Sequence, residues 1–230
     1  MPISSETLKR YAVCILGLFF SAQGVAITKL GALGVSPISS VANVMSLRLP
    51  ALSLGNWLII WNCVLILGQI LILRRKFQPI QLLQIPLSFL FGTFTDFGMW
   101  AFSWASPELY PLRLVNICCG TIILGFGIAL CVIANAVMNS GEAFVKAISD
   151  TTHKDFGTLK ICFDVSCVGI ALVLSLLFFD FTIQGTREGT LIAALCTGMS
   201  SSSLRRVCAS HWSALSAVIA HSKRRFPHDY

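Results

Sequence analysis

Charged residues are scarce in this chain, and their scarcity excludes an ordinary soluble domain. Of its 230 residues, 12% are charged and 55% are hydrophobic, whereas a soluble domain carries roughly 25% charged residues. So few charges cannot cover a globule of this size with a surface that water solvates. The mean hydropathy of +0.78 indicates that lipid is the solvent, so the sequence predicts an integral membrane protein in contact with the bilayer.

Catalytic and metal-binding motifs are also missing. The sequence has no nucleotide-binding loop, no nucleophile paired with a base, no histidine cluster, and no CxxC among its nine cysteines. Most of these cysteines lie in apolar runs, where a thiol acts as a small hydrophobe. The net charge of +7 comes from short basic clusters between apolar runs, which fits an anionic membrane face better than nucleic acid. We therefore expect no enzyme activity, cofactor, metal or nucleic-acid partner.

Long apolar runs are abundant. A helix needs about 20 residues to cross the hydrocarbon layer, and strands of a membrane barrel would show an alternation that is absent here. Six runs meet the requirement for a helix, the last with the shortest apolar part: 11–28, 54–73, 82–102, 114–134, 159–179 and 187–204. The expected fold class is all-α and polytopic, with six transmembrane helices.

The two halves of the chain resemble each other. A shift of 103 positions places two glycines of the first predicted helix on two of the fourth, and a shift of 102 places Asn62 on Asp164. The glycine pairs are Gly17 with Gly120 and Gly24 with Gly127. Each half, 11–104 and 112–205, reads as helix, polar connector, helix, helix. Because each half has an odd number of spans, three, the second half enters the membrane from the opposite side. This inverted repeat is found in many secondary transporters.

The repeat and the basic residues together predict how the chain is oriented. The first helix has the features of a signal peptide, but its counterpart in the second half favours a retained helix that follows a short N-terminal segment, 1–10. Two groups of Lys and Arg fall on opposite sides: Lys9, Arg10, Arg74, Arg75, Lys76, Lys146, Lys154, Lys160, Arg205, Arg206, Lys223, Arg224 and Arg225 against Lys29, Arg48, Arg113 and Arg187. The larger group marks the cytoplasm, so both termini should be cytoplasmic.

Two polar connectors and the tail complete the expected organisation. Ser36–Leu49 and Asn139–Ser149 are long enough for a short helix each. These helices could lie at the membrane interface or enter the protein as half-helices with free N-terminal N–H groups. The tail, 206–230, reads either as an interfacial amphipathic helix with a basic end or as a frayed basic extension.

Several short motifs resemble a known family. They are Gly31–Pro37, Leu54–Trp57 and Phe91–Asp96 in the first half, and Phe156–Thr158 and Gly189–Leu195 in the second. Together they resemble the bacterial YczE/YyaS/YitT-type membrane proteins over roughly residues 10–205. The resemblance implies a multi-pass protein of the bacterial cytoplasmic membrane and implies no settled activity. Val137–Glu142 departs from the glycine- and proline-rich turn usual there, although Glu142 stands where the family usually has an acidic residue.

Polar residues within the spans are the candidate site. An ionisable residue inside a span is costly, so it tends to face the protein interior or a cavity. Asp164 and its counterpart Asn62 are therefore candidates for a solute or ion pathway. The alternative for Asp164 is an ion pair with Lys160, one turn earlier. Asp96 could guard an entrance or simply be solvated at the interface.

The connectors add two further candidates, Ser36 and Glu142, because they could line a pathway between the halves. From this plan we expect a permease for a small solute, with a proton or another cation as a candidate co-substrate. The alternative is an accessory or regulatory membrane protein that transports nothing and acts through a protein partner.

Overall fold

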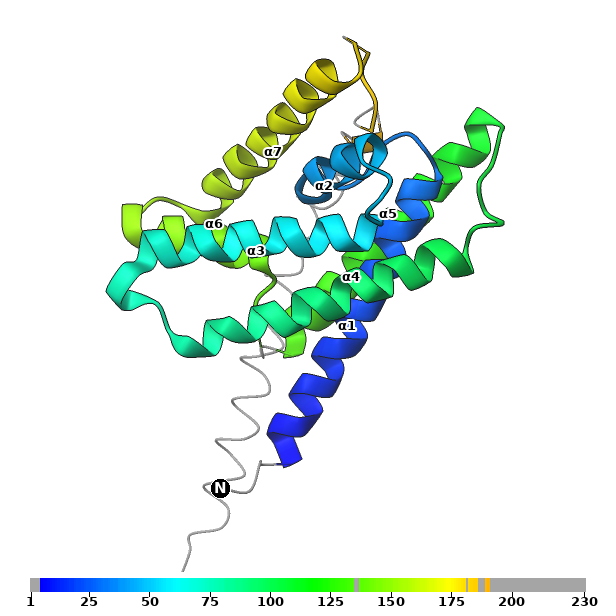
Figure 1. Cartoon of the computed structure of the whole chain (residues 1–230). Helices are drawn as coiled ribbons and strands as arrows, with labels where there is room; N and C mark the ends of the chain where they lie inside the picture. Colours follow the sequence, from blue (N-terminus) through cyan, green and yellow to red (C-terminus); the bar gives the residue numbers. More distant parts are fainter. Residues whose placement is uncertain (1–4, 135–136, 181, 186–188, 191–230) are drawn as a thin grey trace, which may run out of the picture.

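The structure is a computed structural model, and it describes residues 5–134, 137–180, 182–185 and 189–190. Helices account for 81% of this part of the chain, which contains no strand. The long helices are α1 (Ser5–Leu30), α3 (Leu54–Leu73), α4 (Gln84–Ala101), α5 (Tyr110–Ala134) and α7 (Phe156–Phe178) (Figure 1). Two shorter helices are α2 (Pro37–Arg48) and α6 (Ser140–Thr152), and two 3-10 turns, Arg74–Lys76 and Pro79–Leu83, link α3 to α4.

Within the described residues, four helices are long and apolar enough to cross a membrane: α1, α3, α5 and α7. They coincide with four of the six predicted spans and are consistent with a membrane protein. The third predicted span is present as α4, but this helix is not one of the four. Gln84, Ser88, Thr93 and Asp96 lower its apolar character. The sixth, 187–204, lies almost entirely outside the described residues, so six spans stay a prediction.

Helices α1 and α5 cross in direct backbone contact. A Cβ atom added to Gly24 would lie 2.5 Å from the backbone nitrogen of Leu124, and one added to Gly127 would lie 2.3 Å from that of Ser21. Gly17 meets Gly127, and Gly24 meets Gly120, so the helices are antiparallel. Small residues allow this approach, which lipid-embedded helices require because lipid supplies no hydrophobic driving force between them.

Both polar connectors form helices, as the sequence predicts. Helix α2 packs against α3 and α7, and helix α6 packs against the same two helices (Figure 1). The inner faces of both are buried: Pro37, Ser39, Ser40, Val41, Ala42, Asn43 and Val44 in α2, and Ser140, Gly141, Ala143, Val145 and Ala147 in α6. The connectors thus lie inside the helix bundle, where polar backbone ends can be satisfied by protein.

The N-termini of α3 and α7 are capped in the same way. The hydroxyl of Ser53 accepts a hydrogen bond from the backbone N–H of Asn56 at 3.1 Å. The carboxylate of Asp155, 102 positions after Ser53, accepts a hydrogen bond from the backbone N–H of Thr158 at 2.9 Å. Each cap satisfies one of the N–H groups that the first helical turn leaves free, so both helices begin at corresponding positions.

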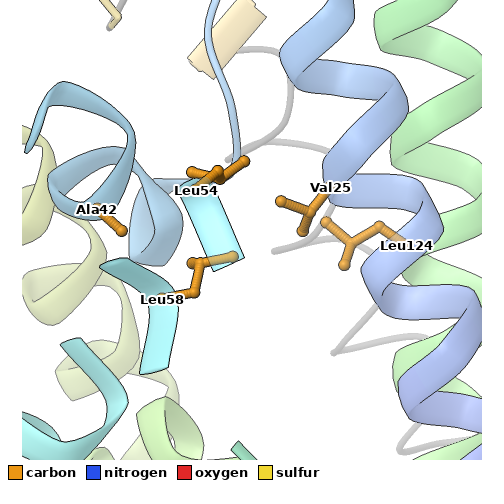
Figure 2. Close-up of a cluster of buried hydrophobic side chains, with 5 residues drawn as sticks. All are labelled: Val25, Ala42, Leu54, Leu58 and Leu124. Carbon is orange, nitrogen blue, oxygen red and sulfur yellow. The ribbon is translucent and has the colours of Figure 1, made fainter. Parts of the chain in front are cut away.

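A buried cluster joins the two halves at the centre of the molecule. It consists of Val25, Ala42, Leu54, Leu58 and Leu124, which come from α1, α2, α3 and α5 (Figure 2). Trp61 and Phe91 pack against this cluster from α3 and α4. Because the cluster fixes the distances between these helices, it also fixes the walls of the polar cavity beside it.

Candidate solute site

A cavity of about 80 Å³ lies between the two halves. Its described walls come from α1, the start of α2, α3, α4, α5, the start of α6, and α7. The structure brings four of the five predicted pathway residues to this cavity: Ser36, Asn62, Glu142 and Asp164. Their side chains are separated by up to 128 positions in the sequence, so helix packing alone brings them together.

Asn62 is a buried amide in the wall of the cavity. Its side chain is 6% exposed and lines the cavity, and its polar atoms are not among the fully enclosed atoms without a partner in the described part of the chain, so they face the open space. A polar solute in the cavity can supply both a donor and an acceptor to this amide.

Asp164 and Lys160 form an ion pair one turn apart on α7, and both line the cavity. The side chains of Lys160 and Asp164 are 18% and 15% exposed, so the two charges are largely removed from solvent. Lys160 contacts one carboxylate oxygen, Oδ1, and its ammonium lies 5.9 Å from the centre of the Phe163 ring. The alternative weighed from the sequence, a Lys160–Asp164 pair, is therefore present, and it is part of the cavity wall.

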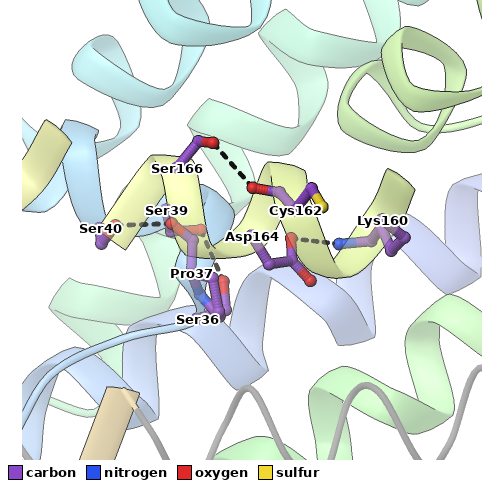
Figure 3. A network of polar contacts seen from close by, with 8 residues as sticks. All are labelled: Ser36, Pro37, Ser39, Ser40, Lys160, Cys162, Asp164 and Ser166. Carbon is purple, nitrogen blue, oxygen red and sulfur yellow. Dashed lines mark hydrogen bonds and ion pairs between the residues drawn. The ribbon is translucent and has the colours of Figure 1, made fainter. Parts of the chain in front are cut away.

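The first turn of α2 forms the wall beside Asp164 (Figure 3). The Ser36 hydroxyl donates to the Ser39 hydroxyl at 3.0 Å, and the Ser40 hydroxyl donates to the Cys167 carbonyl of α7 at 3.4 Å. Pro37 is the first residue of α2 and fits a helix start because it needs no N–H partner. The positive end of the α2 dipole thus faces the cavity that Asp164 also lines.

The start of α6 contributes the opposite connector. Asn139 precedes the helix as its N-cap, and Glu142 lies in its first turn. Both residues line the cavity. The two connectors therefore present the same end, the N-terminus, to one space.

Residues at corresponding positions of the two halves line this cavity. The pairs, 103 or 102 positions apart, are Ser21 with Leu124, Val25 with Ile128, Ser36 with Asn139, Ser39 with Glu142, Leu58 with Lys160, and Asn62 with Asp164. The pairs are equivalent in position but differ in charge. Among these wall residues the ionisable ones, Glu142, Lys160 and Asp164, all belong to the second half.

Asp96 lies away from this cavity and makes structural contacts. Its carboxylate accepts a hydrogen bond from the Ser53 hydroxyl at 2.5 Å and another from the backbone N–H of Gly55 at 2.8 Å. These groups form the N-terminus of α3, where the helix dipole favours a negative charge. Through these contacts Asp96 joins α4 to the start of α3.

Comparison with known proteins identifies the family. A model described as a family of unknown function, DUF6198, matches residues 8–206. The chain belongs to this family. No curated protein and no solved structure matches it. The DUF6198 match covers the region that carries the YczE/YyaS/YitT-type motifs, and that finer resemblance stays a resemblance.

One polar network of this DUF6198 protein was missed by the sequence analysis. The amides of Gln69 and Gln84 exchange hydrogen bonds at 3.1 and 3.2 Å. Gln69 also donates to the Ser140 carbonyl at 3.1 Å, and the hydroxyls of Ser88 and Ser140 lie 3.3 Å apart. This network fixes the start of α6 against α3 and α4.

A sequence signal for the network exists in α4. The buried residues of this helix are Gln84, Ser88, Gly92, Thr95 and Gly98, which recur every three or four positions and share one face. Each residue is polar or small, and their spacing on an otherwise apolar helix predicts an inward-facing polar stripe.

Proposed function

We propose that this DUF6198 protein is a permease, not an enzyme, that carries a small polar solute through the cavity between its two halves. The observation that carries this proposal is Asn62. This amide is 6% exposed and lines the cavity, with polar atoms that face the open space. Solute sites of this kind combine a mostly apolar wall with a few convergent polar groups.

The helix contacts support an inverted repeat. Gly17 corresponds to Gly120 and Gly24 to Gly127, and in space Gly17 meets Gly127 while Gly24 meets Gly120. Each glycine therefore contacts the counterpart of the other, as residues related by a twofold axis do. The connectors follow the same rule, since α2 contacts α7 and α6 contacts α3. Transporters with inverted repeats hold their solute near such an axis.

The proposal includes the cellular location of the protein and the orientation of its termini. The distribution of Lys and Arg places both termini in the cytoplasm, and the YczE/YyaS/YitT-type motifs imply a bacterial cytoplasmic membrane. A proton or another cation is the candidate co-substrate, because Asp164 and Glu142 line the cavity.

An unbiased efflux assay tests the proposal. Liposomes that contain the purified protein are loaded with a mixture of small metabolites, and the solutes that remain inside are measured over time by mass spectrometry. The control is Asn62→Trp, whose ring fills the cavity. We expect at least one solute to leave faster through the wild type than through Asn62→Trp. Identical retention of every solute in both preparations would favour the accessory protein that acts through a partner.

A further inference from the structure

The charge of the cavity wall is unevenly distributed. Two neutral polar residues of the first half, Ser39 and Asn62, correspond to acids of the second half, Glu142 and Asp164. The described wall thus carries two carboxylates and one ammonium, that of Lys160. Among these groups, the Asp164 carboxylate attracts a cation, because it lies where little water screens it.

One oxygen of Asp164 is available to a ligand. Lys160 contacts Oδ1, whereas Oδ2 makes no hydrogen bond within the described residues and is not among the fully enclosed unpartnered atoms. A carboxylate accepts several hydrogen bonds at its two oxygens. Lys160, which already pairs with this carboxylate, carries a primary ammonium on a flexible alkyl stem, so a ligand with the same groups can make the same kind of contact.

The α3 wall supplies further polar groups. The Asn62 amide lines the cavity, and the indole N–H of Trp61 is buried without a hydrogen-bond partner among the described residues. Trp61 and Phe91 also line the cavity, and aromatic side chains can attract cations through their ring faces. The remaining wall is largely apolar, with Leu58, Leu124 and Ile128.

We propose that the cavity binds a small organic ammonium ion. Its N–H groups donate to the free oxygen of Asp164 and to the Asn62 carbonyl, and its alkyl part lies against the apolar wall. An inorganic cation fits this wall less well, because Mg²⁺ and Ca²⁺ need six or more oxygen ligands and the wall offers much hydrocarbon. This assignment rests on the proposed function and names the class of solute.

Ligand-dependent melting of the purified full-length protein tests the assignment. The probes are n-butylammonium, n-butanol and butyrate, which share one alkyl chain, at matched ionic strength. We expect a saturable rise in melting temperature with n-butylammonium alone, because binding to the folded state stabilises it. An equal response to n-butanol would show that the charge of the ligand is not recognised. A larger response to butyrate would show that the cavity prefers an anion. Either result overturns the assignment.

Two variants locate the binding. Asp164→Asn should abolish the response to n-butylammonium, while Asp96→Asn, whose carboxyl lies outside the cavity, should retain it. If Asp164→Asn does not fold, Asn62→Leu replaces it and should weaken binding about tenfold, as expected for a lost hydrogen bond to a charged ligand. Full binding by the folded cavity variant would overturn the site.

The two proposals fail separately. Efflux of other solutes without specific binding of n-butylammonium would retain the permease and reject the ammonium. Specific binding without any efflux would retain the ammonium site and reject the permease, which leaves a ligand-binding accessory protein.

Discussion

In the proposed site, Asp164 and Lys160 combine stability with ligand recognition in one pair of side chains. Both charges are more than four-fifths buried, so removing one partner leaves the other charge without compensation. Because Oδ2 of Asp164 is not used by this pair, a stabilising role for the pair and a binding role for Asp164 are compatible.

Asp164→Asn should lower the stability of the folded protein by about 1–3 kcal/mol, below the full cost of breaking a buried pair because Lys160 retains some contact with solvent. The double change Lys160→Met with Asp164→Asn should recover most of that loss, since it removes both charges. Melting temperature in detergent measures the effect. The double variant should nevertheless fail to bind n-butylammonium. Recovery of both properties would show that Asp164 takes no part in binding.

The helices show what the sequence could predict. Apolar length alone predicts α1, α3, α5 and α7, because a membrane span is a local property of 20 or so residues. The composition of the connectors predicts α2 and α6. The predicted helix ends are less accurate. The first span was expected over 11–28, whereas the helix extends over Ser5–Leu30, because a helix can continue beyond the hydrocarbon layer.

The candidate site was predictable in part. Asn62 and Asp164 stand out because a polar residue in a span is costly, and the repeat relates them. The contacts of Asp96 with Ser53 and Gly55 could not be predicted, because these partners lie at the start of another helix, about 40 positions away in the sequence. The crosswise packing of α2 on α7 and α6 on α3 creates the cavity, and no local pattern encodes which helices meet.

The crossing of α1 and α5 gives a prediction with a matched control. Gly24→Ala places a Cβ 2.5 Å from the Leu124 nitrogen, so the helices must separate, and the melting temperature should fall. Gly169→Ala makes the same chemical change on α7, where no atom of the described residues lies within 4 Å of the new Cβ. It should leave stability unchanged or raise it by up to about 1 kcal/mol, because alanine favours helix. Equal effects of both changes would show that the α1–α5 contact does not limit stability.

At the scale of the whole molecule, the topology depends on whether α4 crosses the membrane. This helix runs antiparallel to α3 along its length: Asp96 binds the start of α3, and Gln84 binds Gln69 near its end. Its 18 residues extend about 27 Å, close to the roughly 30 Å of hydrocarbon. The polar residues that lower its hydropathy form hydrogen bonds within the protein, including Ser88 and Thr95, so they do not prevent it from crossing.

Reporter fusions after α4, α6 and α7 distinguish the two topologies. If α4 crosses, fusions at Leu109 and Gly185 report the outside and a fusion at Lys154 reports the cytoplasm. If α4 does not cross, all three results are reversed, because every later helix then starts from the opposite side. A fusion at Lys76 precedes α4 and should report the cytoplasm in both cases, which makes it the internal control.

We expect the first pattern, since it keeps Lys146 and Lys154 in the cytoplasm as the positive-inside rule requires. The reversed pattern would place α5 parallel to α1 across the membrane, which the antiparallel contacts of Gly17 with Gly127 and Gly24 with Gly120 contradict, and it would remove the inverted repeat on which the proposed pathway rests.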